Sequence, residues 1–176
     1  EAGRCKSLTP GLLENDSIWL HMEYKYLLEL LKNGQYERFS QAFRDAAIPF
    51  LDPDVYGRST LENVSFLASS ANPDPSVHGR GFVARLSGST AEFLEMWQIM
   101  FFGERPFVME QGRLALRLSP MLPDYLIPAS GRVSARFLGV CDVTYQIAPN
   151  VRVCPNACTA AEYVLETEDG SARVER

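Results

Sequence analysis

The chain has 176 residues, of which 46% are hydrophobic and 22% are charged, proportions that are ordinary for a folded globular protein. The formal net charge is -5, and the 17 basic residues are scattered, which argues against nucleic-acid binding because phosphate backbones are held by clustered Lys and Arg. The chain opens in polar sequence without the apolar region of a signal peptide, and no stretch approaches the ~20 apolar residues of a membrane span. We therefore expect a cytoplasmic protein that binds neither nucleic acid nor membrane.

The cysteines give little indication of a metal site. They are Cys5, Cys141, Cys154 and Cys158. The last two form a C-x3-C pair, but a zinc site needs two further ligands nearby, and neither His21 nor His78 has a suitable spacing. A disulfide is the alternative that remains. We expect reduced cysteines, as in an intracellular protein, and no metal or other cofactor.

Apolar residues before Pro106 recur with the period of helices. The predicted helices run from Asn15 or Asp16 to Gly34, from Tyr36 to Ile48 and from Ser89 to Gly103. Asn15 and Asp16 can each cap the first helix with a side chain, and Gly34 can end it in the left-handed conformation. Two helices joined by a tight glycine turn form a hairpin, the unit from which helical barrels and solenoids are built.

The segment between the second and third helices, about Asp52 to Ser87, is broken up by proline and glycine. A loop of this length with little regular structure is uncommon in a compact domain and often functional. After Pro106 the apolar residues alternate with polar ones, which predicts strands. The predicted strands lie within 113–118, 132–147, 151–153 and 163–165. We expect the charged residues 166–176 to be frayed.

Two clusters lie where helices are predicted to begin. Glu14-Asn15-Asp16-Ser17 and then His21 stand at the start of the first helix, where backbone N–H groups favour anions. The commoner interpretation is a helix cap and a core histidine. Leu86-Ser87-Gly88-Ser89-Thr90 precedes the third helix and could hold a phosphate with amides and hydroxyls. An ordinary cap is again commoner, and the lysine of a Walker A loop is missing.

A third cluster of charged residues lies on the long connection. It contains Arg58, Glu62, His78, Arg80 and Arg85. Arginine and histidine here could bind phosphate or a sugar, although solvated loop charges are more frequent.

Five motifs follow one another along the chain. They are Leu8-Thr9-Pro10-Gly11, Glu14-Asn15-x5-His21, Leu86-Ser87-Gly88-Ser89-Thr90-Ala91, Phe102-Gly103-x-Arg105-Pro106 and Arg136-Phe137-x-Gly139…Tyr145-x-Ile147. Their order and spacing, over roughly Ser7 to Asn150, resemble those of cellobiose phosphorylase, of the glycoside hydrolase family 94 type, and of its relatives, the β-1,3-glucan phosphorylases. The Glu14-to-His21 spacing is kept.

The resemblance implies an α+β fold. Residues 1–105 would form the last helices of an (α/α)6 catalytic barrel, and residues 106–176 a small C-terminal antiparallel β domain. It also implies an inverting phosphorylase that produces α-glucose 1-phosphate from a β-glucan oligosaccharide and inorganic phosphate, and it allows a homodimer. Phosphate takes the place of the water that attacks in inverting hydrolases.

Carried over residue by residue, the resemblance assigns a substrate-binding role to Glu14, which would hydrogen-bond hydroxyls of the transferred sugar. His21 would hold the phosphate, and Ser87 and Gly88 would complete the phosphate cradle. The general acid of such enzymes is an aspartate in an earlier barrel segment. We therefore expect no catalytic residue in this chain, and no turnover by the chain alone.

Two other functions are compatible with the same residues. An inverting glycoside hydrolase on the same barrel would need a carboxylate base where the phosphate otherwise sits. A non-catalytic carbohydrate-binding or structural module would bind glucan without any effect of phosphate.

Overall fold

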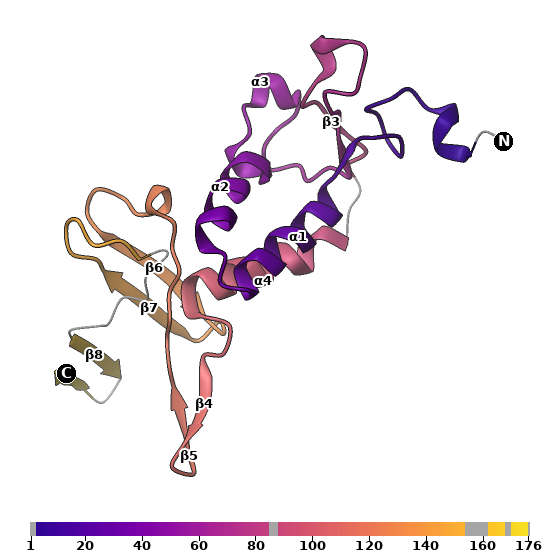
Figure 1. Ribbon diagram of the computed structural model, residues 1–176. Coiled ribbons are helices and arrows are strands. Elements are labelled where there is room, and N and C mark those ends of the chain that lie inside the picture. The colour runs from indigo at the N-terminus through magenta and orange to yellow at the C-terminus, as the bar shows by residue number, and fades with distance from the viewer. Residues whose placement is uncertain (1–2, 85–87, 154–161, 168–169, 176) are drawn as a thin grey trace. The chain divides into compact units, whose positions relative to one another are not determined.

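The chain is described by a computed structural model covering residues 3–84, 88–153, 162–167 and 170–175. It divides into a first unit, Glu1–Met100, and a second unit, Phe101–Arg176. Helices with a small sheet form the first unit, and antiparallel hairpins form the second (Figure 1). The predicted α+β class is therefore confirmed. Among the described residues, no helix has both the length and the apolar character needed to cross a membrane.

Three helices contribute most of the core of the first unit. They are α1 (Leu20–Lys32), α2 (Tyr36–Ala46) and α4 (Gly88–Phe102). Gly34, with φ of 70°, provides the left-handed turn that joins α1 to α2. The largest fully buried side chains of these helices are Leu20, Tyr24, Leu27, Leu31, Phe39, Phe43, Met96, Ile99 and Met100. Burying each one contributes about 1.5–3 kcal/mol relative to leaving it exposed, so this core is the main source of stability in the unit.

The first helix begins later than the sequence predicts. Residues Ile18–Trp19 form β1, which pairs with β2 (Phe66–Leu67), and β2 pairs in turn with β3 (Gly81–Phe82). The backbone therefore remains extended until Leu20, whose N–H donates to the carbonyl of Ser65 at 3.0 Å. The prediction of a helix capped by Asn15 or Asp16 is wrong, because pairing with a distant strand overrides the local capping signal.

The connection between α2 and α4 is also more regular than predicted. Besides β2 and β3 it contains η2 (Ile48–Phe50), α3 (Pro53–Tyr56) and η3 (Pro75–Val77), and a further short helix, η1 (Arg4–Ser7), lies near the N-terminus. Asp52 and Asp74 cap α3 and η3 by accepting backbone N–H groups. Each element is only two to four residues long, too short for a periodic apolar pattern to reveal it.

The described strands of the second unit form three hairpins. They are β4 (Phe107–Glu110) with β5 (Arg113–Leu116), β6 (Arg132–Phe137) with β7 (Cys141–Gln146), and β8 (Glu162–Thr167) with β9 (Gly170–Glu175); η4 (Asp124–Leu126) lies between the first two. The expectation of a frayed C-terminus is wrong for residues 170–175, because β8 supplies the backbone partners of β9. Residues 151–153, predicted as a strand, belong to none.

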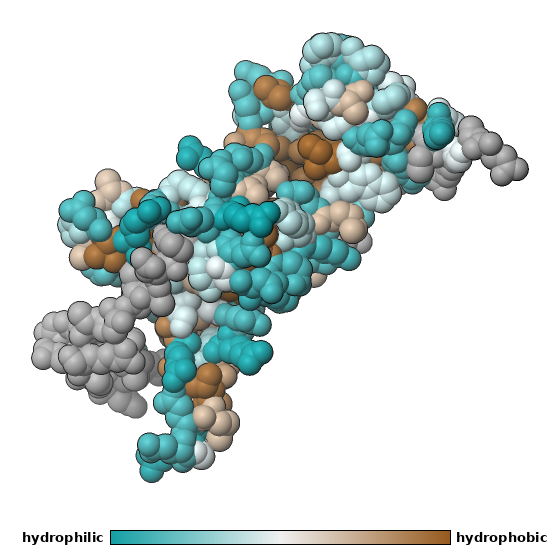
Figure 2. Space-filling view, viewed as in Figure 1, coloured by the Kyte–Doolittle hydropathy of each residue, from teal (hydrophilic) through white to brown (hydrophobic). Residues whose placement is uncertain are grey.

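The β4–β5 hairpin presents apolar side chains to solvent. Phe107 lies opposite Leu116 and Met109 opposite Leu114, so the four share one face of the hairpin. They are between 47% and 70% exposed. Figure 2 shows apolar atoms, in brown, on the surface of this hairpin.

Candidate functional site

Glu14 lies in a turn with unusual backbone geometry. We call residues 11–17 the Glu14 turn. Leu13 and Asp16 on either side of Glu14 have φ of 48° and 57°, the left-handed region that non-glycine residues rarely adopt. Within the turn, an isolated bridge joins Leu12 to Asn15, and the Ser17 hydroxyl donates to the carbonyl of Leu13. The Glu14 residue itself is half-buried.

A segment more than fifty residues later in the chain holds this turn. The backbone N–H of Ser69 donates to the carbonyl of Gly11 at 3.0 Å, and its hydroxyl donates to the carbonyl of Asp16. Asn72 is buried and donates from Nδ2 to the carbonyl of Pro10 at 3.1 Å. Neither Ser69 nor Asn72 stands in a motif that would mark it as functional in the sequence. The Asn72-Pro73-Asp74-Pro75 run indicates turns but does not indicate what the turns contact.

His21 is the second residue of α1, directly after the strand that fixes the start of the helix. Its ring lies against the Trp19 ring with centroids 5.3 Å apart, and Trp19 in turn meets Phe66 of β2 edge to face at 5.2 Å. The Nδ1 atom of His21 is buried and has no hydrogen-bond partner among the described residues. A buried polar atom in this state is rare in proteins and is compatible with a ligand that completes the site.

Helices α1 and α4 run side by side in the same direction (Figure 1). The Tyr24 and Phe93 rings lie 5.4 Å apart, Lys25 Nζ lies 3.9 Å from Glu92, and further along both helices Lys32 forms an ion pair with Glu95. The N-terminal ends of the two helices therefore lie at the same end of the pair. Backbone N–H groups and the positive ends of both helix dipoles favour an anion there.

The four predicted site residues are placed as follows. Glu14 lies before β1, His21 lies in the first turn of α1, and Gly88 is the first residue of α4. Ser87 lies outside the described residues. Because α1 and α4 are parallel, His21 and Gly88 lie at the same end of the helix pair.

A groove between α1 and α4 lies outside this predicted site. It has a volume of about 410 Å³ and is lined by Lys25, Leu28, Glu29, Ala91, Glu92 and Glu95. Glu14, His21 and Gly88, the predicted site residues that the structure describes, are not among its lining residues. Its three glutamates disfavour an anionic ligand.

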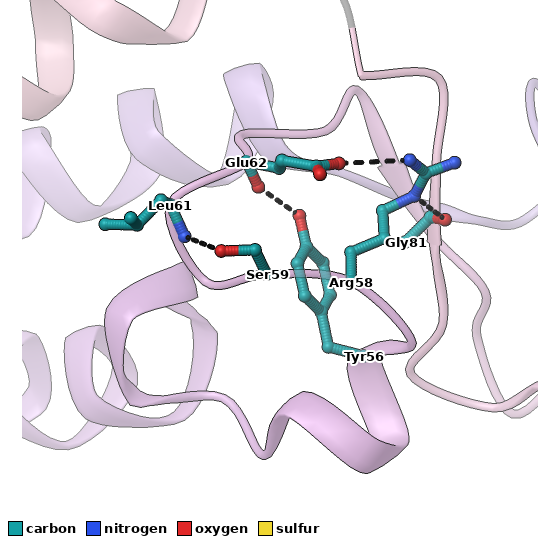
Figure 3. Close-up of polar contacts among 6 residues, drawn as sticks. All are labelled: Tyr56, Arg58, Ser59, Leu61, Glu62 and Gly81. Atoms are coloured by element: carbon teal, nitrogen blue, oxygen red, sulfur yellow. Dashed lines mark hydrogen bonds and ion pairs between the residues drawn. The ribbon is translucent and has the colours of Figure 1, made fainter.

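Three charged residues of the long connection, Arg58, Glu62 and His78, have structural partners. Arg58 donates from Nε to the carbonyl of Gly81 at 3.0 Å and pairs with Glu62 at 3.1 Å, while the buried Tyr56 hydroxyl donates to the Glu62 carbonyl at 2.5 Å (Figure 3). The Arg58 bond thus ties the segment just after α3 to Gly81 of β3. His78 Nε2 lies 2.8 Å from the carbonyl of Asn72. Within this cluster, Arg85 lies outside the described residues.

The cysteines of the C-x3-C pair, Cys154 and Cys158, also lie outside the described residues. Cys141 is exposed and free. Within the part of the chain that the structure describes, no three His, Cys, Asp or Glu side chains are grouped so that they could hold a metal ion.

Comparison of the chain with models of protein families, with curated proteins and with solved structures gave no match.

Proposed function

We propose that this chain is the C-terminal part of an inverting glycoside phosphorylase that releases α-glucose 1-phosphate from a β-glucan oligosaccharide. In this proposal the helices of the first unit belong to an (α/α)6 barrel, and an earlier segment of the parent protein supplies the aspartic acid. The observation that carries the proposal is the Nδ1 atom of His21. It is buried and lacks a partner among the described residues, at the end where α1 and α4 both begin.

The chemistry of this end suits an inorganic phosphate. A phosphate oxygen can accept a hydrogen bond from an imidazole nitrogen, and phosphate carries the negative charge that helix N-termini stabilise. In the proposed reaction, one phosphate oxygen attacks the anomeric carbon as the glycosidic oxygen leaves with a proton from the acid. His21 and the start of α4 hold the phosphate, and Glu14 accepts hydrogen bonds from the sugar hydroxyls.

The test is phosphate-dependent release of glucose 1-phosphate from β-glucan oligosaccharides by the full-length parent protein. Replacing His21 by alanine removes one contact to phosphate, so we expect KM for phosphate to rise about tenfold or more, the factor that corresponds to one hydrogen bond to a charged group. Met22→Ala is the matched control, because Met22 is the next residue on α1 and its side chain is 54% exposed. This control should leave both KM values unchanged.

Two outcomes would contradict the proposal. Free glucose formed without phosphate, and unaffected by His21→Ala, would indicate a glycoside hydrolase. Binding of glucan with no product of either kind would indicate a non-catalytic module.

A further inference from the structure

The backbone around Glu14 is strained on both sides of the residue that the proposed function assigns to sugar binding. Leu13 and Asp16 have φ of 48° and 57°. Left-handed non-glycine residues cost about 1–3 kcal/mol each and persist only where the surrounding structure holds them. Aspartate tolerates this conformation better than leucine does, so Leu13 is the more strained of the two. Such residues gather at functional sites, where a fixed geometry is needed.

Ser69 joins the two ends of the turn. Its backbone N–H binds the Gly11 carbonyl at one end, and its hydroxyl binds the Asp16 carbonyl at the other. Glu14 stands between these two attachment points. Removing the hydroxyl would release the Asp16 end while leaving the Gly11 end bound.

Asn72 fixes the segment that carries Ser69. Its Nδ2 donates to Pro10, its Oδ1 accepts from the N–H of Asp74 at 2.9 Å, and its own carbonyl contacts His78. Both groups of the side-chain amide are therefore used. The Asn72 backbone also packs against Gly11, where an added Cβ would lie 2.4 Å from Asn72 N. The two segments fit without room for a side chain between them.

We propose that Ser69 and Asn72 are positioning residues for the sugar-binding carboxylate: they hold the Glu14 turn in its left-handed geometry without touching the sugar. This inference rests on the role of Glu14 in the proposed function. A carboxylate held in place before the sugar arrives loses less conformational freedom on binding, so the sugar binds more tightly. His21 follows β1, whose pairing with β2 does not use the Ser69 hydroxyl.

The test compares three serine variants. Ser69→Ala removes the bond to Asp16, and Ser69→Thr keeps the hydroxyl and should restore the wild-type behaviour. Ser59→Ala is the matched control. The Ser59 hydroxyl accepts the N–H of Leu61 at 3.2 Å, just as the Ser69 hydroxyl accepts that of Ala71 at 3.2 Å. Among the described residues, Ser59 makes no hydrogen bond to the Glu14 turn.

The first measurement is hydrogen–deuterium exchange of residues 8–17 in the purified chain. The amides of Leu12 and Asn15 donate to the carbonyls of Thr9 and Leu12 and report directly on the turn. We expect exchange to be about three- to tenfold faster in Ser69→Ala, the factor that corresponds to one lost hydrogen bond. The Ser59→Ala variant should exchange at the wild-type rate.

The second measurement is steady-state kinetics of the same variants in the parent protein. We expect KM for the oligosaccharide to rise about three- to tenfold in Ser69→Ala, while KM for phosphate stays constant. Unchanged exchange in residues 8–17, or an equal rise of both KM values, would overturn the inference. If the wild-type parent makes no glucose 1-phosphate, the proposed function is wrong, and the exchange rates alone decide whether Ser69 holds the turn.

Discussion

Left-handed residues other than glycine are held in different ways in the two units of the chain. In the second unit, Gln111 has φ of 50° and Gly112 has φ of 77° between the paired residues Glu110 and Arg113. This two-residue turn matches the twist of its own strands, so it needs no distant partner. In the first unit, the left-handed residues beside Glu14 are held by Ser69, 53 positions after Asp16. A strained turn can therefore be encoded locally or by the tertiary structure.

Replacing Gly11 by alanine should give the largest effect. The new Cβ would lie 2.4 Å from Asn72 N, and alanine would have to adopt φ of +74°. Overlap and backbone strain together should lower the free energy of unfolding by about 2–5 kcal/mol. Both tryptophans, Trp19 and Trp97, belong to the first unit, so denaturation followed by their fluorescence measures this loss.

Gly112→Ala is the matched variant in the second unit. Gly112 has nearly the same φ, +77°, but nothing lies within 4 Å of the Cβ that would be added. We expect Gly112→Ala to destabilise the β4–β5 hairpin by about 1–2 kcal/mol and to leave the stability of the first unit unchanged. Hydrogen exchange of β4 and β5 should rise while the tryptophan transition stays unchanged. Equal losses for both glycine variants would show that strain alone, and not the contact with Asn72, sets the cost.

The next largest effect is expected from alkaline pH, which should lower the free energy of unfolding of the first unit. Burial raises the pKa of Tyr24 and of Tyr56 from 10.0 to about 12. Between these values the unfolded chain releases two protons that the folded unit keeps, so stability falls as pH rises from 10 to 12 and is fully retained below 10. The urea midpoint of the tryptophan transition should therefore be lower at pH 11 than at pH 9.

Two tyrosine variants test this explanation. Tyr56→Phe should weaken the pH dependence, because one of the two buried hydroxyls is gone. Tyr26→Phe removes a hydroxyl from a residue that is 46% exposed and should leave the pH dependence intact. A full pH dependence in Tyr56→Phe would contradict the assignment.

The smallest effect is expected from a surface ion pair of the second unit. Arg136 and Asp142 face each other across β6 and β7 at 3.3 Å, with side chains 61% and 73% exposed. Exposed pairs of this kind contribute about 0–1 kcal/mol and are screened by salt. Asp142→Asn should thus change the thermal unfolding midpoint little, and less at high salt. A large loss at high salt would show that the pair is not simply a solvated contact.

The sequence predicts those elements whose signals are local. The Phe39 and Phe43 stripe and Gly34 placed α2 and the turn before it, and the apolar run before Gly103 placed α4. Alternation around Val133 and Tyr145 revealed β6 and β7. The start of α1 differs from the prediction because β1 pairs with residues far along the chain. The short elements of the connection escape prediction because two to four residues cannot show a periodic apolar pattern.

For the same reason, the sequence indicates only some residues of the candidate site. Glu14 and His21 stand in a motif with a recognisable spacing, so the sequence suggests them. The strain at Leu13 and the contacts of Ser69 and Asn72 depend on hydrogen bonds between distant segments. Neither serine nor asparagine carries a local signal of such a bond.

The contact between Asn72 and Pro10 also sets the order of events during synthesis. The two residues are 62 positions apart, so at the usual rate of translation Asn72 is added about 3–12 s after Pro10. During that interval the turn that carries Glu14 has no partner to hold its left-handed residues and samples other conformations. The hairpins of the second unit close between near neighbours in the chain and need no such delay. The nascent chain thus holds the Glu14 turn in its left-handed geometry only after the segment around Asn72 has left the ribosome.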